Sequence, residues 1–576
     1  MRRTRRTFVR SGAAALGLTL IAGLTLGAVQ PSAAPATAPA LAALPLDAAP
    51  VVVGPADPAA VLEIGLALRG RDPAGLARAV AELSDPTAPG HGQVYTPEEL
   101  GDRFGLSVAD EDQLVATLTA AGLSVSGRVP QRTSLRVRGS VADLQRVLGL
   151  ELQQLTDPST GASYIASVAA PVVPPSLASA VAGILGLEPR LPMSAVAPVD
   201  APAPPTRGLT PQDLARAYDF LPLWEAGITG AGQDVAILQF GVDTDEDLAV
   251  YDAAFGLNGP LPERITVGDG LVDAPADFAT EAALDTQVLR GAAPGAQILV
   301  YGFARTFSMA IAVDEIVAAG RAKIISLSYG KCFKPGEFIS ELEVSFGRES
   351  FARAALAGVS MYAASGDWGA FSCHVFDPTD HRESTFWPSC TDNVVSVGGT
   401  FLETREDGSY LRETGWQDYL TTGGTGGGFS HDDPMPAWQQ GAGVQNDRSN
   451  GNRQCPDVAA AADPDTGYLI FVTNAETGEA GWQMVGGTSA AAPLWAGIQA
   501  LMQEAAAQQG IDALGFMPPR YYRIAQSDPA AFNDVIRGGN LVDEATPGWD
   551  FATGVGTPNV AALTDAVIAD VQATPE

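Results

Sequence analysis

The chain has 576 residues, and 46% of them are hydrophobic, which is enough to bury a large core and to build more than one domain. Its 66 Asp and Glu outnumber its 34 Lys and Arg, and the formal net charge of −32 argues against nucleic acid and anionic membranes as partners. Such a charge suits a protein that stays soluble outside the cell, and equally one that works in acid, where many carboxylates would be protonated.

The N-terminus, residues 1–42, has a basic head and an apolar core of small residues, followed by an Ala/Pro-rich segment. This pattern predicts an export signal and not a retained membrane span. The run "RRTFVR" at 5–10 resembles the twin-arginine pattern, whose pathway exports folded proteins; an ordinary secretory signal with extra arginines is the alternative. We therefore expect a secreted, extracellular protein.

Residues 46–188 have the pattern of a small α+β domain. Alternation of apolar and polar residues predicts strands at 61–68 and 133–140, and helical spacing of apolar residues predicts helices at 73–84, 110–122 and 141–149. Residues 189–208 are too rich in Pro and Ala to pack, so we expect a linker there. An exposed linker is a natural site of proteolytic processing.

From residue 209 to 576 the pattern changes. The β-rich runs "DVAILQF", "AQILVYGF", "AKIISLSYG", "GVSMYAASGD" and "VVSVGGT" alternate with helical stretches, which predicts βαβ units and a mainly parallel sheet. In such sheets, functional sites form where loops leave the carboxyl ends of the strands.

Four cysteines fall in the second half of the chain: Cys332, Cys373, Cys390 and Cys455. An exported protein can form disulfides, and four cysteines allow three pairings. Of these we favour a bond between Cys332 and Cys373. The spacing matches no zinc-ligand pattern.

The segment "GGTSAAAP", residues 486–493, precedes an apolar stretch with helical spacing. It predicts a loop that enters a buried helix with Ser489 at its mouth, where unpaired backbone N–H groups and the helix dipole favour an anionic intermediate. The alternative is that Ser489 is only an N-cap.

A nucleophilic serine needs a base, usually histidine, and the chain has only four histidines: His91, His374, His381 and His431. None lies in the His-Gly-Thr type of setting that a subtilisin-type enzyme requires upstream of its serine. The base is therefore sought among the carboxylates.

Glu281 and Asp285 lie four residues apart, on one face of a helix predicted over 280–289. The apolar continuation of that face argues for burial, where two carboxyls share a proton; a solvated pair is the alternative. Asp367, in "AASGDWG", ends a β-rich run and supplies a third carboxylate. Its alternative role is that of a turn aspartate.

These carboxylates and Ser489 together resemble the sedolisin family of serine-carboxyl peptidases, which includes the kumamolisins. The segment "SDPTAPGHGQVYTPEEL" is similar to the family's activation domain, "LTPQDLARAYDF" to the start of its mature enzyme and "GGTSAAAP" to its serine motif. The resemblance implies a doubly wound, subtilisin-like, mainly parallel sheet preceded by an α+β, ferredoxin-like pro-domain that inhibits the zymogen.

The resemblance also assigns roles by position. Ser489 is expected to be the nucleophile, Glu281 the base, and Asp285 the residue that holds Glu281 in place. Asp367 is expected to face the oxyanion as a neutral acid, together with the Ser489 backbone N–H; a protonated aspartic acid serves this way in ketosteroid isomerase. Such an enzyme should work at acid pH.

Near the C-terminus, "FNDVIRGGN" and "ATPGWDFATGVGTPN" resemble the family's calcium loop. The resemblance implies one structural Ca²⁺, held by the carboxylates of Asp534 and Asp550 and the carbonyls of Val535, Thr546 and Gly548. The family commonly has isoleucine at the position of Val535 and glycine at that of Thr546, changes that carbonyl ligands tolerate. Two turn aspartates are the alternative.

The glycine-rich segment "GGTGGGFSHDDP", residues 423–434, lacks the Gly-Lys-Ser/Thr ending of a phosphate loop. By resemblance it lies near the substrate cleft, where its backbone can pair with an extended peptide; a flexible surface loop is the alternative. The residues expected to bind substrate are Ser328, Tyr329, Gly330, Gly427 and Gly428.

The sequence thus predicts a secreted, monomeric, acid-active endopeptidase that acts on polypeptides, with no nucleic-acid partner and no membrane contact after signal removal. A tripeptidyl-peptidase of the same family is one alternative. Others are a histidine-dependent protease that uses His374 or His381, and a catalytically silent binding protein.

Overall fold

The computed structural model describes residues 50–156, 161, 163–169, 171–187, 199–201, 208–268, 277–303, 308–332, 338–375, 379–419, 423–441, 444, 446, 448, 451–474 and 477–573. The predicted export signal and most of the predicted linker lie outside these residues. Within them, no helix combines the length and the apolar character that a membrane crossing requires.

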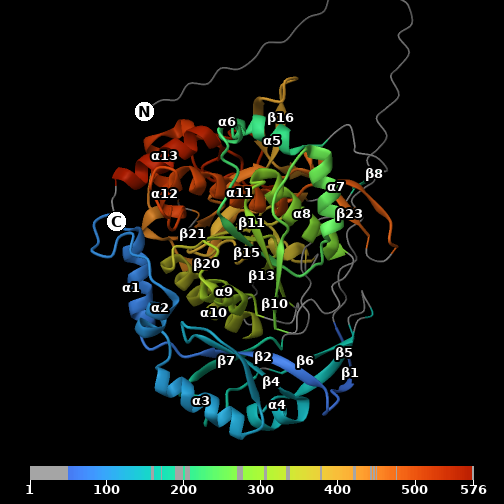
Figure 1. Cartoon of the computed structure of the whole chain (residues 1–576), viewed down its shortest axis with the longest axis vertical. Helices are drawn as coiled ribbons and strands as arrows, with labels where there is room; N and C mark the ends of the chain where they lie inside the picture. Colours follow the sequence, from blue (N-terminus) through green and yellow to red (C-terminus); the bar gives the residue numbers. More distant parts are fainter. Residues whose placement is uncertain are drawn as a thin grey trace, which may run out of the picture. The chain divides into compact units, whose positions relative to one another are not determined.

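The N-terminal part of the described chain is an α+β unit (Figure 1). Its four-stranded antiparallel sheet has the order β3-β4-β2-β7, the ferredoxin-like arrangement. The strands are β2 (Val61–Leu68), β3 (Ser124–Arg128), β4 (Ser134–Ser140) and β7 (Val181–Leu185), and the helices are α1 (Pro73–Ser84), α2 (Pro97–Arg103), α3 (Val108–Ala120) and α4 (Val141–Leu148). A second sheet joins β1 (Val51–Pro55), β5 (Leu152–Thr156) and β6 (Ser163–Ser167).

Local signals in the sequence set the ends of these helices. The Ser140 side chain accepts a hydrogen bond from the Asp143 N–H and so caps the start of α4. Gly149, with a φ of 68°, ends the same helix in the left-handed conformation. The predicted strand at 61–68 and the predicted helices at 73–84, 110–122 and 141–149 are confirmed to within two residues.

The C-terminal part is built around one large sheet, as predicted. Six strands run parallel in the order β10-β11-β9-β12-β14-β16, β17 pairs antiparallel with β16, and β22 pairs parallel with β16. The strands are β9 (Asp234–Gln239), β10 (Glu263–Val267), β11 (Gln297–Phe303), β12 (Ile324–Leu327), β14 (Ser360–Ala364), β16 (Val395–Thr404), β17 (Tyr410–Gly415) and β22 (Val458–Ala461).

Helices cover both faces of this sheet because its strands are apolar on both sides. In β9, Val235 and Ile237 pack into one core with α8 (Asp277–Ala292), α11 (Thr488–Ala507) and α13 (Val560–Ala573). Ala236 and Leu238, which point to the opposite face of the sheet, pack into a second core with α9 (Met309–Ala319) and α10 (Phe338–Leu356).

Shorter elements complete this part of the chain. The helices are α5 (Pro211–Ala217), α6 (Leu221–Glu225), α7 (Asp245–Phe255) and α12 (Pro518–Ser527). The strands are β8 (Val199–Ala201), β13 (Lys331–Cys332), β15 (Phe386–Trp387), β18 (Gln417–Asp418), β19 (Gly423–Gly424), β20 (Gly428–Pro434), β21 (Asn452–Cys455), β23 (Tyr468–Thr473), β24 (Ala480–Val485), β25 (Phe532–Asn533) and β26 (Thr557–Pro558).

The N-terminal unit packs against α9 and α10. Its residues Leu76 and Leu185 belong to the same buried cluster as Ile311 of α9 and Val344 of α10. Polar contacts add specificity: the Thr133 hydroxyl donates to the carboxylate of Asp314 at 2.6 Å. Asp314 is fully buried, and burial of a carboxyl group without a hydrogen-bond partner costs free energy. The bond from Thr133 reduces that cost.

Ion pairs lie beside this hydrogen bond. Arg136 of β4 reaches Glu315 of α9 at 3.0 Å and Glu63 of β2 at 3.0 Å. Arg353 of α10 approaches the same Asp314 carboxylate at 3.2 Å. The two units are therefore held together by apolar packing and by the polar contacts of Asp314 and Glu315 in the middle of α9.

Removal of the Thr133 hydroxyl should weaken the contact between the two units. In Thr133→Val the buried Asp314 carboxylate loses a donor, and we expect the free energy of unfolding to fall by roughly 1–3 kcal/mol. Denaturant unfolding of the full chain measures this difference. Thr117→Val, at an exposed hydroxyl of α3, is the matched control and should change stability much less; equal effects of the two variants would contradict the prediction.

Candidate active site

Ser489 lies at the start of the buried helix α11, as predicted. The helix begins at Thr488, so Ser489 is its second residue, and the N-cap is Gly487. The alternative that Ser489 is only an N-cap is therefore wrong. Gly487 has a φ of 116°, a conformation that residues with a Cβ avoid. Since the N–H groups of a helix's first turn have no intrahelical acceptor, the Ser489 N–H is available to a ligand.

The Ser489 hydroxyl is linked to a buried carboxylate through Ser328. Its Oγ donates to the backbone oxygen of Ser328 at 3.3 Å. The hydroxyl of Ser328 in turn contacts Oδ1 of Asp285 at 2.5 Å and the backbone oxygen of Ser489 at 3.1 Å. Ser328 follows β12 directly, so the carboxyl end of that strand joins α8 to α11.

Glu281 and Asp285 lie one turn apart on α8 and are both buried, with exposed fractions of 1% and 0%. The predicted burial of this pair is confirmed. Burial raises the pKa of Asp285 well above its ordinary range, and the charge of Glu281 raises it further; the hydrogen bond from Ser328 acts in the opposite direction. Repulsion between two buried carboxyls favours a state in which the pair carries one proton.

Asp367 follows β14, the neighbour of β12, and points to the start of α11. Its Oδ1 accepts hydrogen bonds from the N–H and from the hydroxyl of Thr488, both at 2.8 Å. Burial raises the pKa of Asp367, whereas these two hydrogen bonds lower it. Both bonds go to Oδ1, which leaves Oδ2 to carry a proton and donate it to a bound oxygen.

The glycine-rich segment lies against the Asp367 turn. The Gly424 N–H donates to the backbone oxygen of Asp367 at 2.9 Å, and the Gly426 N–H donates to that of Gly366 at 2.7 Å. A Cβ at Gly426 would lie 2.0 Å from the Ser365 oxygen, so only glycine fits there. The segment is therefore a fixed wall of the site at these positions and not the flexible loop considered above.

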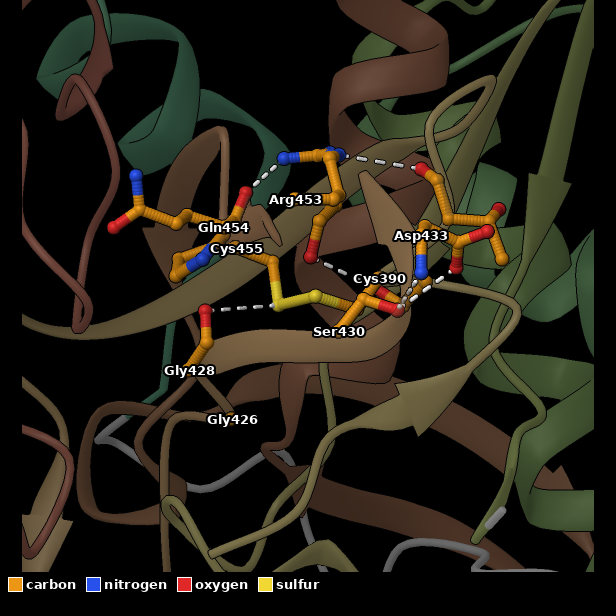
Figure 2. The surroundings of a disulfide bond; sticks show 12 residues. Cys390, Gly426, Gly428, Ser430, Asp433, Arg453, Gln454 and Cys455 are labelled. Atoms are coloured by element: carbon orange, nitrogen blue, oxygen red, sulfur yellow. Dashed lines mark hydrogen bonds between the residues drawn. A yellow bond between two sulfur atoms is a disulfide. The ribbon is translucent and has the colours of Figure 1, made fainter. Parts of the chain in front are cut away.

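Two disulfides fasten these walls. Cys332 is bonded to Cys373, which confirms the favoured pairing and ties the segment after Ser328 to the segment after Asp367. Cys390 is bonded to Cys455, and Cys455 pairs in β21 with Gly428 of β20. Figure 2 shows this second bond beside Gly426 and Gly428.

The residues expected to bind substrate fall into two groups. The backbone oxygen of Ser328 accepts from the Ser489 hydroxyl. The atoms nearest to a Cβ at Gly330, Gly427 and Gly428 belong instead to Phe386, Phe551 and Thr385. The side chain of Tyr329 is instead buried, with its ring against Phe240 and Phe278. Any contact of Tyr329 with a substrate is therefore made by its backbone.

No histidine takes part in the contacts of the serine. In the part of the chain that the structure describes, the Ser489 hydroxyl bonds to Ser328 and to no imidazole. The ring of His374 lies beside that of His381, with centroids 5.1 Å apart and planes tilted by 30°, and His374 approaches the Asp380 backbone oxygen at 3.3 Å. This geometry does not support the histidine-dependent alternative.

The residues expected to bind calcium meet in two adjacent loops. The Gly548 N–H donates to the Asp534 carboxylate at 3.1 Å, and the Thr546 N–H donates to Asp550 at 2.9 Å. Among the described residues no hydrogen bond goes to the backbone oxygens of Val535, Thr546 or Gly548, so these oxygens can face a cation. Burial raises the pKa of Asp550 to about 6, and a cation would offset that penalty.

This donor set has the chemistry that calcium requires, because two carboxylates and three carbonyls are hard oxygen ligands. The described residues contain no group of three or more His, Cys, Asp and Glu side chains that could hold a metal. The fit therefore depends on the backbone oxygens.

Sequence reasoning missed two contributors to the site. Thr488 holds Asp367 through its hydroxyl and its N–H, and the Ser328 hydroxyl holds Asp285. Thr488 stands next to Ser489 in the serine motif, so its position was a usable signal. Ser328 was expected only to contact substrate, and its bond to Asp285 depends on the packing of β12 against α8.

Comparisons with known proteins agree with this geometry. Residues 49–190 match the family described as "Pro-kumamolisin, activation domain", and residues 276–556 match the one described as "Subtilase family". Kumamolisin from Bacillus sp. (strain MN-32) is 30% identical over 508 residues, which cover 81% of this chain and 85% of that protein. The chain belongs to the sedolisin family of serine-carboxyl peptidases.

Two further relatives span the same architecture. Tripeptidyl-peptidase 1 from Homo sapiens is 27% identical over 555 residues, which cover 89% of this chain and 92% of that protein. A solved structure of Pseudomonas sedolisin, a serine-carboxyl proteinase complexed with two molecules of pseudo-iodotyrostatin, is 30% identical, with a TM-score of 0.56 over 64% of this chain and 98% of that chain. The expected subtilisin-like sheet with an N-terminal activation domain, characteristic of sedolisin-family zymogens, is thus confirmed.

Loss of the Thr488 hydroxyl should make stability more pH-dependent. In Thr488→Val, Asp367 loses a donor that favours its ionised form, so its pKa in the folded state rises further. A raised pKa in the folded state costs stability only once the carboxyl ionises, so the deficit should grow from about pH 3 to pH 7, by roughly 1 kcal/mol.

Denaturant unfolding at several pH values, in a Ser489→Ala background that prevents digestion, measures this effect. Thr391→Val is the matched control, because that buried hydroxyl donates to a neutral backbone oxygen at 2.8 Å and its loss should cost the same at every pH. A deficit of Thr488→Val that does not vary with pH would contradict the prediction.

Proposed function

We propose that this protein is a secreted, acid-active endopeptidase that is made as a self-processing zymogen. The observation that carries the proposal is the linkage of Ser489, through Ser328, to the buried pair of Glu281 and Asp285, with Asp367 on the other side of the serine. A nucleophile, a carboxylate base system and a protonated donor are the parts that acyl transfer needs.

In the first step the Oγ of Ser489 attacks the carbonyl carbon of the scissile peptide bond. Its proton passes to the carboxylate of Glu281, which works as general base. Asp285, fixed by the Ser328 hydroxyl, keeps the pair's shared proton and so leaves the negative charge on Glu281. In this structure the Ser489 hydroxyl donates to the backbone oxygen of Ser328. The hydrogen bond from a nucleophile to its base often tightens only when substrate binds.

The negative charge that develops on the carbonyl oxygen is met by two donors. One is the Ser489 N–H at the start of α11, and the other is the protonated Oδ2 of Asp367. Thr488 holds Oδ1 of the same carboxyl and so aims Oδ2 at the substrate. A neutral acid in a water-poor site stabilises this charge without needing to reorganise.

The intermediate then breaks down. The C–N bond is cleaved as Glu281 returns its proton to the departing amine, and an acyl-enzyme ester on Ser489 remains. Water, deprotonated by the same carboxylate, hydrolyses this ester and releases the second product. Formation and hydrolysis of the acyl-enzyme thus use the same base and the same oxyanion donors.

Activity should be confined to acid pH. Asp367 must be protonated to donate, so activity falls as the pH rises through its raised pKa. On the acid side, the Glu281 and Asp285 pair must keep one negative charge, so activity falls again once both are protonated. The acid optimum lies between these two limits.

The N-terminal unit would inhibit the enzyme until acid processing. The linker strand β8 pairs antiparallel with β24, which leads directly into the Gly486–Ser489 segment. This contact brings the linker to the neighbourhood of the nucleophile and favours cleavage within the same molecule. Export, by the twin-arginine route or the ordinary secretory route, would deliver the zymogen outside the cell.

Polypeptides are the proposed substrates of the processed monomer. An extended peptide would lie along the backbone of Ser328, Tyr329 and Gly330 on one side and of Gly427 and Gly428 on the other. Release of tripeptides from free N-termini is a second candidate, because one relative is named tripeptidyl-peptidase 1. Peptides with blocked N-termini separate the two, since only an endopeptidase cleaves them.

One calcium ion would stabilise the C-terminal loops. Asp534, Asp550 and the backbone oxygens of Val535, Thr546 and Gly548 would hold it, and its charge would offset that of the two carboxylates. The ion would have a structural role and would take no part in the chemistry.

Glu281→Gln should abolish the acid activity. Loss of the general base should lower kcat by about 100-fold or more, with folding retained because Gln has the same shape. The rate of cleavage of a denatured protein from about pH 2 to pH 9 measures this, with the variant zymogen cleaved in trans by wild type. Glu413→Gln, at another buried carboxylate, is the control; activity near neutrality that survives Glu281→Gln would refute the proposal.

Removal of calcium should lower thermal stability. Chelation leaves Asp534 and Asp550 without a counter-charge, so we expect the Tm to fall by several degrees and to recover when Ca²⁺, but not Mg²⁺, is restored. Differential scanning calorimetry at fixed pH measures the shift. Asp534→Asn should remove most of this change in Tm. If neither chelator nor Ca²⁺ changes the Tm of the parent protein, the proposed site does not bind calcium.

A further inference from the structure

The turn that carries Asp367 lies against a loop near the C-terminus of the chain. The Ala370 N–H, just after Asp367 in the sequence, donates to the backbone oxygen of Asn540 at 3.0 Å. A Cβ at Gly369 would lie 2.4 Å from that same oxygen, so the two backbones touch with no side chain between them. The contact joins a segment that follows β14 to one that follows β25.

Asn540 is fully buried, and its side chain fixes the loop around it. Its Oδ1 accepts hydrogen bonds from the N–H groups of Val542 at 3.2 Å and of Asp543 at 2.7 Å. Its Nδ2 donates to the backbone oxygen of Phe551 at 3.0 Å. The amide therefore closes a local turn and ties that turn to a second loop, which requires a side chain that both accepts and donates.

The backbone next to Asn540 is strained, which indicates that the surrounding contacts impose its conformation. Leu541 has a φ of 75°, in the left-handed region that residues with a Cβ rarely adopt. Its side chain lies against the Asp367 turn, because a Cβ at Gly369 would be 2.8 Å from the Leu541 Cδ1. Strain of this kind persists only where neighbouring structure over-determines it, and it is concentrated at functional sites.

Asn540 also lies against the glycine-rich segment. A Cβ at Gly427 would be 3.0 Å from the Asn540 Nδ2 and 1.8 Å from the Phe551 oxygen. The same segment holds the Asp367 turn, because the Gly369 N–H donates to the Gly424 oxygen at 2.9 Å. Asn540 therefore contacts both the Asp367 turn and the segment that is hydrogen-bonded to it.

Two sets of hydrogen bonds thus place Asp367. Thr488 holds Oδ1 of its carboxyl, whereas Gly424 and Asn540 hold the backbone of its turn. The proposed donor, Oδ2, has to meet the substrate oxygen at hydrogen-bond distance, and a small displacement of the turn would lengthen that bond. Loss of the Asn540 amide would release the loop that supports the turn.

We propose that Asn540 is a positioning residue that holds Asp367 where its Oδ2 meets the oxyanion. Asn540 is buried and contacts no reacting atom. It acts through its backbone oxygen, which accepts from Ala370 and which its own side chain keeps in place. This inference rests on the proposed role of Asp367, which Asp367→Ala tests separately.

The test compares a peptide aldehyde with the matched peptide alcohol. The Ser489 Oγ bonds to the aldehyde carbon as its C=O double bond becomes single, and the hydroxyl proton passes to the hemiacetal oxygen, which occupies the oxyanion position. The alcohol cannot form this bond. In Asn540→Ala we expect the Kd of the aldehyde to rise about tenfold and that of the alcohol to stay within about twofold.

Isothermal titration calorimetry measures both values on each variant zymogen after processing in trans by immobilised wild-type enzyme. The stoichiometry reports the folded fraction separately from the Kd, so a merely structural loss would lower the stoichiometry and leave both Kd values unchanged. Asn540→Ser is the milder variant should alanine prevent folding, because its hydroxyl can still accept from the turn N–H groups. It loses the bond to Phe551, and the aldehyde Kd should rise about threefold.

Gln503→Ala is the matched control. Gln503 is also buried; its Nε2 donates to the Asp512 oxygen at 3.2 Å, and its Oε1 accepts from the Leu514 N–H at 2.9 Å. Its loss therefore removes the same kinds of bond. Gln503 lies near the far end of α11, roughly 20 Å from Ser489, so both Kd values should stay in place.

Three results would overturn the inference: an aldehyde Kd that the Asn540 variants leave unchanged, equal increases for aldehyde and alcohol, or an equal increase for the aldehyde in Gln503→Ala. If one of these occurs while Asp367→Ala weakens aldehyde binding, the proposed role of Asp367 stands and only that of Asn540 fails. If Asp367→Ala leaves aldehyde binding unchanged, the proposed oxyanion donor itself fails.

Discussion

The site depends on the close packing of two buried helices, α8 and α11. The contact is made by small residues: a Cβ at Gly497 of α11 would lie 2.6 Å from the Cβ of Ala292 on α8. Both helices also pack against the large sheet, so the carboxylates of α8 and the serine of α11 are held at one edge of that sheet. Water is excluded from most of this contact, and electrostatic interactions are stronger in the low-dielectric environment that results.

That exclusion of water is the physical basis for the proposal that carboxylates take the place of a histidine base in this protein. A carboxylate in water is too weak a base for a serine, but burial and the charge of Glu281 raise the pKa of Asp285. Burial also raises the pKa of Asp367. In the proposed mechanism, burial would thus produce both the base and the oxyanion donor, and it would confine activity to low pH.

The remaining walls of the site are made rigid by covalent and close backbone contacts. Two disulfides and the hydrogen bonds of Gly424 and Gly426 hold the Asp367 turn from both sides. Proposed catalytic groups that sit on loops are therefore fixed almost as firmly as those on helices. Preorganisation of this kind lowers the reorganisation that the transition state would otherwise require.

The sequence by itself determined the elements and the identity of the proposed catalytic groups. Local signals were sufficient for the elements, such as the alternation in 61–68, whereas the roles of Ser489 and of the carboxylates were assigned by resemblance to the sedolisin family. Only the tertiary structure decided how these groups meet. The bond of Ser328 to Asp285 and the bonds of Thr488 to Asp367 join residues 43 and 121 positions apart. The side chain of Tyr329 is buried between elements. Periodicity reports the environment of one segment, whereas such contacts depend on strand order and on the alignment of neighbouring strand ends, which no local pattern carries.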